Sequence, residues 1–209
     1  MDAQFITGSM CDCCGVPLPD DGTGVEQVLV CDDCLTAVRP WSRGRAAMVY
    51  DGTARKLILA LKHVDRLDLA PAMAGWLARA ARPLVMADQV VCPIPLHLRR
   101  LMKRKYNQSA HVSARLARDL GLAHQPDLLV RTRHTPAQDH RGALDRFANM
   151  ADALAVNPRR AASLQGRPVL LIDDVMASGA TITTAAMALL QAGSGPVSVA
   201  VLARAVKDH

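Results

Sequence analysis

Aromatic residues are scarce in this chain of 209 residues, and the shortage restricts the fold classes open to it. Phe, Trp and Tyr make up 3% of the residues, although hydrophobic residues as a whole reach 50%. The core must therefore be built from Ala, Leu, Val and Ile, with Met as a filler. All-β proteins usually depend on aromatic and β-branched residues, so this composition favours helices packed on a parallel sheet. The length suits one domain with a small appendage.

Charged residues are absent between Asp174 and Arg204, which raises the question of a membrane span. A spanning helix needs about twenty continuous apolar residues. Threonines and a Gly-Ser-Gly-Pro break at 193–196 divide this stretch, so we expect two buried elements joined by a turn. The first ten residues have no basic start and no apolar run of signal-peptide length. We therefore expect a cytoplasmic protein with no membrane partner.

Two common nucleotide-binding motifs are also missing. The chain has no G-x-x-x-x-G-K-[ST], which argues against a P-loop NTPase. It has no G-x-G-x-x-G after a strand, which argues against a dinucleotide-binding fold. The net charge of +6 still favours an anionic partner, either a phosphate ligand or a nucleic acid.

Four of the six cysteines form two C-x-x-C pairs near the N-terminus. Sixteen residues separate the pairs, which is typical of a four-cysteine zinc site, and so short a unit gains from a metal because it cannot build a large core. Cys13 is a spare thiol that is either free or replaces Cys11, and Cys92 is most simply a core residue. Residues 11–34 hold five Asp, one Glu and no Lys or Arg, which argues against direct DNA binding by this unit. The predicted ligands of a structural Zn²⁺ are Cys11, Cys14, Cys31 and Cys34.

The composition of the chain changes at about residue 42. We divide it into a cysteine unit, 1–42, and an α/β domain, 43–209, which contains an irregular polar loop at about 131–150. Strand, helix, strand at the end of the chain is a βαβ unit, so the sheet is at least partly parallel. The apolar spacing predicts helices from Thr53 and over 68–80, 107–120 and 181–192, and strands over 89–92, 169–172 and 197–203.

Two acids and a turn of small residues follow the apolar run at 169–172. In open α/β sheets, ligands bind beyond the carboxyl ends of the strands. The N–H groups of a helix start and nearby hydroxyls donate to phosphate, whereas carboxylates repel it and must address sugar hydroxyls or a divalent cation. A ribose 5-phosphate meets both demands, and a purely structural acidic turn is the alternative. The candidate residues are Asp173, Asp174, Ala177, Ser178, Gly179, Ala180 and Thr181.

The stretch 169–181 resembles the phosphoribosyl pyrophosphate (PRPP) fingerprint of type I phosphoribosyltransferases, with four apolar residues, two acids and a loop ending in Gly-x-Thr. With P-x-P-L at 93–96 and R-x-Y-N-Q at 104–108, the chain resembles the ComF/GntX family throughout its length. The resemblance implies a type I phosphoribosyltransferase fold, which is a mostly parallel sheet flanked by helices, with a small N-terminal zinc ribbon-like unit. It also implies that the acids hold the ribose of PRPP, which binds with Mg²⁺. The chain departs from the family in having Ala177 where a Thr is usual, which removes one phosphate contact.

Further site residues are implied by the same resemblance. Residues 131–150 would form a flap over the ligand, and the basic run at 99–105 would either meet the pyrophosphate or remain a solvated face. The candidates for pyrophosphate and flap contacts are Arg100, Arg104, Arg131, Gln138 and Arg146.

More than one function remains open at this point. The first is phosphoribosyl transfer to an unknown acceptor, with Asp173 and Asp174 as the catalytic residues and catalysis by positioning. The second is a non-catalytic accessory protein of DNA uptake and competence, because the resemblance associates the family with that machinery. Such a protein would respond to PRPP or a nucleotide and bind a partner protein or DNA. A third is a nucleic-acid binder that uses residues 99–105, whose affinity would fall steeply with salt.

Overall fold

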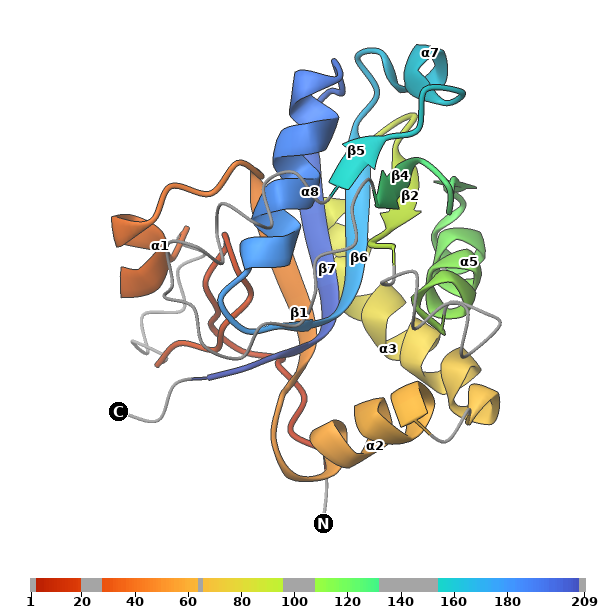
Figure 1. The fold of residues 1–209 in the computed structure, drawn as a ribbon. Helices are drawn as coiled ribbons and strands as arrows, with labels where there is room; N and C mark the ends of the chain where they lie inside the picture. The colour runs from red at the N-terminus through yellow and green to blue at the C-terminus, as the bar shows by residue number, and fades with distance from the viewer. Residues whose placement is uncertain (1–2, 20–27, 64–65, 96–107, 132–153, 207–209) are drawn as a thin grey trace, which may run out of the picture.

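A parallel sheet of five strands forms the centre of the protein in the computed structural model, which describes residues 3–19, 28–63, 66–95, 108–131 and 154–206 (Figure 1). The strand order is β1-β7-β6-β2-β3, and every neighbouring pair is parallel. The predicted class, α/β with a mostly parallel sheet, is therefore confirmed. The strands are β1 (Arg43–Val49), β2 (Val90–Pro93), β3 (Ala123–His124), β6 (Val169–Met176) and β7 (Val197–Arg204), and β4 (Leu129–Arg131) pairs with β5 (Leu154–Val156) in a separate antiparallel ribbon.

Helices cover both faces of the sheet (Figure 1). The helices α2 (Gly52–His63), α3 (Ala70–Ala81) and α5 (Gln108–Leu120) pack on one face, and α8 (Ala180–Gln191) packs on the other. No helix in the described ranges combines the length and apolar character needed to cross a membrane. The short elements are α1 (Asp32–Thr36), α7 (Ala161–Leu164) and the 3₁₀ turns η1 (Leu67–Leu69) and η2 (Arg82–Leu84).

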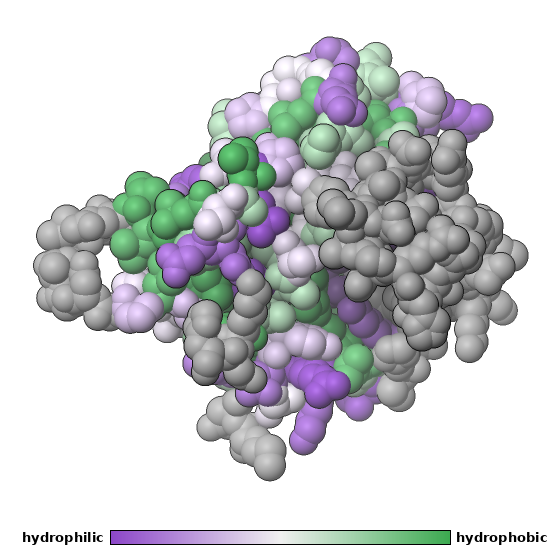
Figure 2. Space-filling view, turned by 60° about the vertical axis from the view of Figure 1, so that its left-hand side comes forward, coloured by the Kyte–Doolittle hydropathy of each residue, from purple (hydrophilic) through white to green (hydrophobic). Residues whose placement is uncertain are grey.

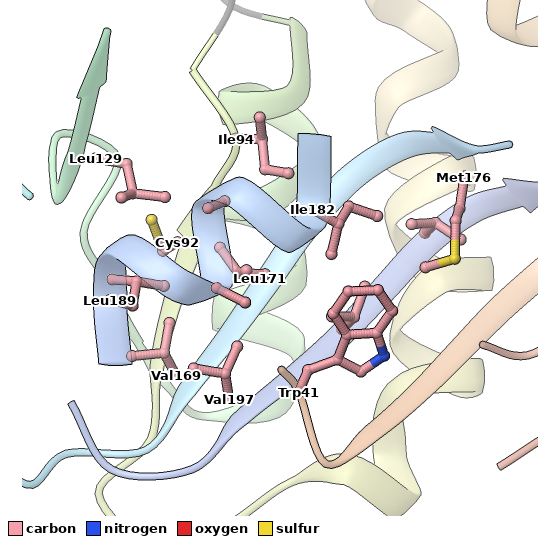
Figure 3. Close-up of a cluster of buried hydrophobic side chains, with 14 of the residues drawn as sticks. Trp41, Cys92, Ile94, Leu129, Val169, Leu171, Met176, Ile182, Leu189 and Val197 are labelled. Atoms are coloured by element: carbon pink, nitrogen blue, oxygen red, sulfur yellow. The ribbon is translucent and has the colours of Figure 1, made fainter. Parts of the chain in front are cut away.

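Strand β6 shows why the apolar run at 169–172 is continuous. Val169 and Leu171 are buried in the cluster beneath α8 (Figure 3), whereas Leu170 and Ile172 are buried in the cluster beneath α2, α3 and α5. A strand covered on both faces has no solvent side, so its residues do not alternate between apolar and polar. The strand runs past the expected end at Ile172 as far as Met176, because β7 continues to pair with it.

The cysteine unit packs on the edge of the sheet formed by β1. Phe5 forms an antiparallel bridge with Met48, and the carboxylate of Asp12 accepts hydrogen bonds from the Arg43 and Arg45 guanidinium groups. Gly44 permits this close approach, because a Cβ there would collide with the backbone of the cysteine unit. The unit therefore shares one hydrophobic core with the sheet. Its division from the domain at residue 42 stays a prediction.

Candidate functional site

Asp173 and Asp174 lie at the carboxyl edge of the sheet, near the end of β6. Oδ1 of Asp174 lies 2.8 Å from Nζ of Lys62 in α2, a residue to which the sequence alone assigns no role. The backbone N–H of Asp174 donates to the Asp173 carboxylate over 2.9 Å. A pocket of about 10 Å³, enough for one water molecule, remains between these groups. The pocket is lined by Leu61, Lys62, Ser109, Val112, Ile172, Asp173, Asp174 and Leu202.

Asp173 has a pKa well above the ordinary value of a carboxyl group. Burial, and secondly the charge of Asp174, raise the pKa of Asp173 to about 7, although the charges of Lys62 and Arg131 act in the opposite direction. A carboxyl group that is half protonated at neutral pH can donate as well as accept a hydrogen bond. A buried carboxyl group with a raised pKa beside a pocket is typical of functional sites.

Residues 177–179 form the turn that leads from β6 into α8. Gly179 precedes the helix with a φ of +79°, a left-handed conformation that glycine adopts without strain. The hydroxyl oxygen of Ser178 accepts a hydrogen bond from the backbone N–H of Ala180 over 3.4 Å, and Thr181 lies in the first turn of α8. A helix start of this kind favours an anion, because its N–H groups have no partner within the helix.

The predicted cationic residues fall in two groups. Arg131, at the end of β4, donates from Nε to the carbonyl oxygen of Pro95 over 3.0 Å. Its charge lies close enough to Asp173 to act on the pKa of that acid, so the fold brings Arg131 toward the acidic pair. The other candidates, Arg100, Arg104, Gln138 and Arg146, lie outside the residues that the structure describes.

Sequence reasoning missed two arginines that contact the turn. Nη1 of Arg204 donates to the carbonyl oxygens of Met176 over 3.1 Å and Ala177 over 2.7 Å. Nη1 of Arg39 donates to the carbonyl oxygen of Ser178 over 3.0 Å. Arg204 is the first charged residue after the long uncharged stretch that follows Asp174. This position could have marked it in the sequence as a residue with a specific partner. Nothing in the sequence around Arg39 points to the turn.

The four predicted zinc ligands come together. The Sγ atoms of Cys11, Cys14, Cys31 and Cys34 all lie within 4.8 Å of one another, with 3.7 Å between Cys14 and Cys31. A tetrahedral zinc ion with Zn–S bonds of about 2.3 Å separates its thiolates by about 3.8 Å. The cluster therefore fits such an ion. Cys13, whose membership the sequence left open, is outside this set.

A larger cavity of about 300 Å³ lies against β1 and α3, lined by Phe5, Trp76 and Arg79 among others. It shares no lining residue with the pocket at the acidic pair. The concentration of charged and hydrogen-bonding groups, rather than cavity size, identifies the carboxyl edge of the sheet as the candidate site.

Three curated proteins illustrate what the chain is similar to. The DNA utilization protein YhgH of Salmonella typhimurium is 32% identical over 202 residues, which cover 94% of this chain and 84% of that protein. The YhgH protein of Escherichia coli K12 is 31% identical with the same coverage. Competence protein F of Haemophilus influenzae is 29% identical over 182 residues, covering 84% of this chain and 78% of that protein. No family model matches the chain.

Two solved structures were also found. The glutamine PRPP amidotransferase from B. subtilis, complexed with ADP and GMP, matches with a TM-score of 0.43 and 18% identity, over 64% of this chain and 26% of that chain. A structure of the allosteric regulatory enzyme of purine biosynthesis matches with a TM-score of 0.42 and 18% identity, over 63% of this chain and 25% of that chain. This chain thus spans about a quarter of each.

Proposed function

Because this chain belongs to the ComF family, together with the DNA utilization protein YhgH and competence protein F, we propose that it acts in DNA utilization and competence by binding PRPP. One observation carries the choice of ligand. An acidic pair lies at the carboxyl edge of a parallel sheet and is followed at once by a turn into a helix. These two features suit the two ends of a phosphorylated ribose, since carboxylates accept hydroxyl hydrogens and helix starts attract phosphate.

Each part of PRPP has a counterpart in the proposed site. Asp173 and Asp174 would accept hydrogen bonds from the 2′- and 3′-hydroxyls, and residues 177–181 would donate to the 5′-phosphate. Arg131 would face the pyrophosphate, whose oxygens also suit Mg²⁺ as a hard cation. The pocket at the acids holds about one water molecule while Lys62 is paired with Asp174. Ribose binding therefore requires the Lys62 side chain to turn away, toward the negative charge of the ligand.

As an enzyme, the protein would transfer the phosphoribosyl group to an acceptor that carries a lone pair. The bond from ribose C1 to the pyrophosphate oxygen breaks, and its electron pair leaves on pyrophosphate. The acceptor forms the new bond to C1 and passes its proton to a base or to water. The site would contribute position and charge rather than a nucleophile. These features support a phosphoribosyltransferase of type I.

A non-catalytic role is the second candidate, and the surface of the cysteine unit favours it. The side chains of Val28, Leu35 and Val38 are 79%, 68% and 96% exposed. Figure 2 shows a hydrophobic surface on the side of the molecule that carries α1 in Figure 1. Clustered apolar residues on a surface are typical of protein interfaces. In this role the site would sense PRPP without consuming it, and the cysteine unit would bind a partner protein.

The four-cysteine cluster is proposed to hold Zn²⁺ in a structural role. Four thiolates fill the tetrahedral coordination of the ion and leave no open position for a substrate. The metal would join residues 11–14 to residues 31–34, which are separated in sequence and lie at the edge of the sheet.

Calorimetric titration with PRPP, with and without Mg²⁺, tests the proposal. Wild type is expected to bind, and the Asp173→Asn/Asp174→Asn double variant is expected to bind about tenfold or more weakly, because it loses charge-assisted hydrogen bonds. Asp127→Asn, which alters a surface acid paired with Arg160, is the matched control. Pyrophosphate release after addition of nucleobases would support transfer, and binding without release would support the accessory role. Failure of wild type to bind PRPP would contradict the site.

A further inference from the structure

Three consecutive backbone carbonyls in the turn after β6 face two guanidinium groups. The carbonyls of Met176 and Ala177 accept hydrogen bonds from Arg204, and that of Ser178 accepts one from Arg39. Across a trans peptide, the N–H of the next residue points opposite to the carbonyl. The three following N–H groups are therefore turned away from the arginines. None of the three donates a hydrogen bond to another residue in the described ranges, so they are available to an anion.

Both arginines also contact the surroundings of the four-cysteine cluster. The guanidinium of Arg39 lies 5.5 Å from the ring centre of Trp41, and the indole N–H of Trp41 donates to the carbonyl of Cys13 over 2.7 Å. Arg204 is 4% exposed and lies within electrostatic range of Cys14. The same two side chains thus connect the surroundings of the cysteine cluster to the turn after β6.

Arg39 lies between two attachments, the cysteine cluster before it and Trp41 after it, which is 3% exposed in the hydrophobic core. The segment that carries it follows α1, a helix of five residues without a buried side chain. Cys31 and Cys34 therefore attach the part of the segment that precedes Arg39. A metal ion on these thiolates would hold the segment in place, as structural metals do in units with small cores.

We propose that Arg39 and Arg204 are positioning residues that couple metal binding at the cysteine cluster to phosphate binding at residues 177–181. They hold the turn with its N–H groups toward the ligand, and this arrangement requires a formed metal centre. The choice of PRPP as the ligand rests on the proposed function, whereas the coupling of the two sites rests on the contacts of Arg39 and Arg204. Coupling between two sites is reciprocal, so PRPP would strengthen metal binding by the factor by which metal strengthens PRPP binding.

The test compares PRPP binding by full-length wild type with zinc, wild type stripped of zinc, zinc-loaded Arg39→Ala and zinc-loaded Arg160→Ala. Arg39 is the better target because Arg204 is buried and its loss endangers folding. We expect binding about tenfold weaker for the stripped protein and for Arg39→Ala, since a lost charge-assisted hydrogen bond is worth about that factor. Arg160 pairs with Asp127 on the surface and serves as the control. Arg39→Lys should recover part of the affinity.

Zinc transfer to a chelator supplies a readout that a merely structural role would not move. In equilibrium competition with the chelator, PRPP should raise the zinc affinity of wild type about tenfold and leave that of Arg39→Ala unchanged, because the variant lacks the link between the sites. Equal PRPP affinity in the loaded, stripped and Arg39→Ala proteins would overturn the coupling and leave the proposed function standing.

Hydrogen exchange measured without PRPP distinguishes a failure of the proposed function from a failure of the positioning role. The backbone N–H of Thr183 donates to the carbonyl of Gly179, so its hydrogen exchange reports on the turn. We expect faster exchange at Thr183 in the stripped protein and in Arg39→Ala, with unchanged exchange at the core strand residue Leu171. If loaded wild type does not bind PRPP, the proposed function fails. Equal exchange at Thr183 in all three proteins would then overturn the positioning role as well.

Discussion

Nζ of Lys62 lies 2.8 Å from Oδ1 of Asp174, and this ion pair joins α2 to the carboxyl end of β6. Both side chains are largely buried, with 26% of Lys62 and 16% of Asp174 exposed. The lysine offsets part of the repulsion between two adjacent acids at the edge of the sheet. It also lines the small pocket beside the two acids.

Replacing Lys62 with Met is expected to destabilise the protein by about 1–3 kcal/mol, because Asp174 keeps its charge and loses its partner. Adding Asp174→Asn should restore most of the lost stability, since the unpaired charge is removed. Urea denaturation of the two single variants and the double variant measures the coupling. Lys56→Met, at an exposed position of the same helix, is the control. Equal free energies of unfolding for Lys62→Met and wild type would contradict the prediction.

The pKa of Asp173 predicts how stability changes with pH. The folded value of about 7 lies above the ordinary value of 3.8, so the folded state holds a proton that the unfolded state releases. The free energy of unfolding should therefore fall as pH rises from about 4 to about 7. Asp173→Asn cannot ionise, so it should show a flatter dependence and exceed wild type in stability at pH 8. Parallel denaturation curves for the two proteins across this range would argue against the raised pKa.

Zinc content should distinguish the cysteines. Cys31→Ser is expected to lose the metal and unfold at lower denaturant concentration, because a serine hydroxyl is a poor zinc ligand. Cys13→Ser should keep about one zinc per chain, since Cys13 is outside the cluster. Elemental analysis of both purified variants provides the measurement. Metal loss from Cys13→Ser would show that the ligand set is different.

A hydroxyl at position 177 should strengthen phosphate binding. Ala177 is exposed at the turn, so a larger side chain can be accommodated there. Ala177→Thr is expected to bind PRPP about three- to tenfold more tightly, the range that one added hydrogen bond supplies. Ala177→Val has the same shape without the hydroxyl and should show no gain. Calorimetry on the three proteins decides the matter, and an equal gain from Val would exclude the hydroxyl as the cause.

Features set by neighbouring residues could be predicted from the sequence. The run 169–172 indicated a strand buried on both faces, and the two C-x-x-C pairs indicated four thiols around one point. Strand β1 could not be predicted. Its sequence contains two arginines, a glycine and two alanines, which have little preference for strands. It becomes a strand because it pairs along its length with β7.

The sequence by itself determined the βαβ unit, the order of acids, turn and helix, and the cysteine set, because each depends on spacing within a short segment. Only the tertiary structure decided which charged side chains contact the acids and the turn. Arg39 reaches Ser178 across 139 positions of the chain, and Lys62 and Arg204 meet the same region from α2 and β7. Such contacts follow from the order of strands and the packing of helices, and no local pattern records them.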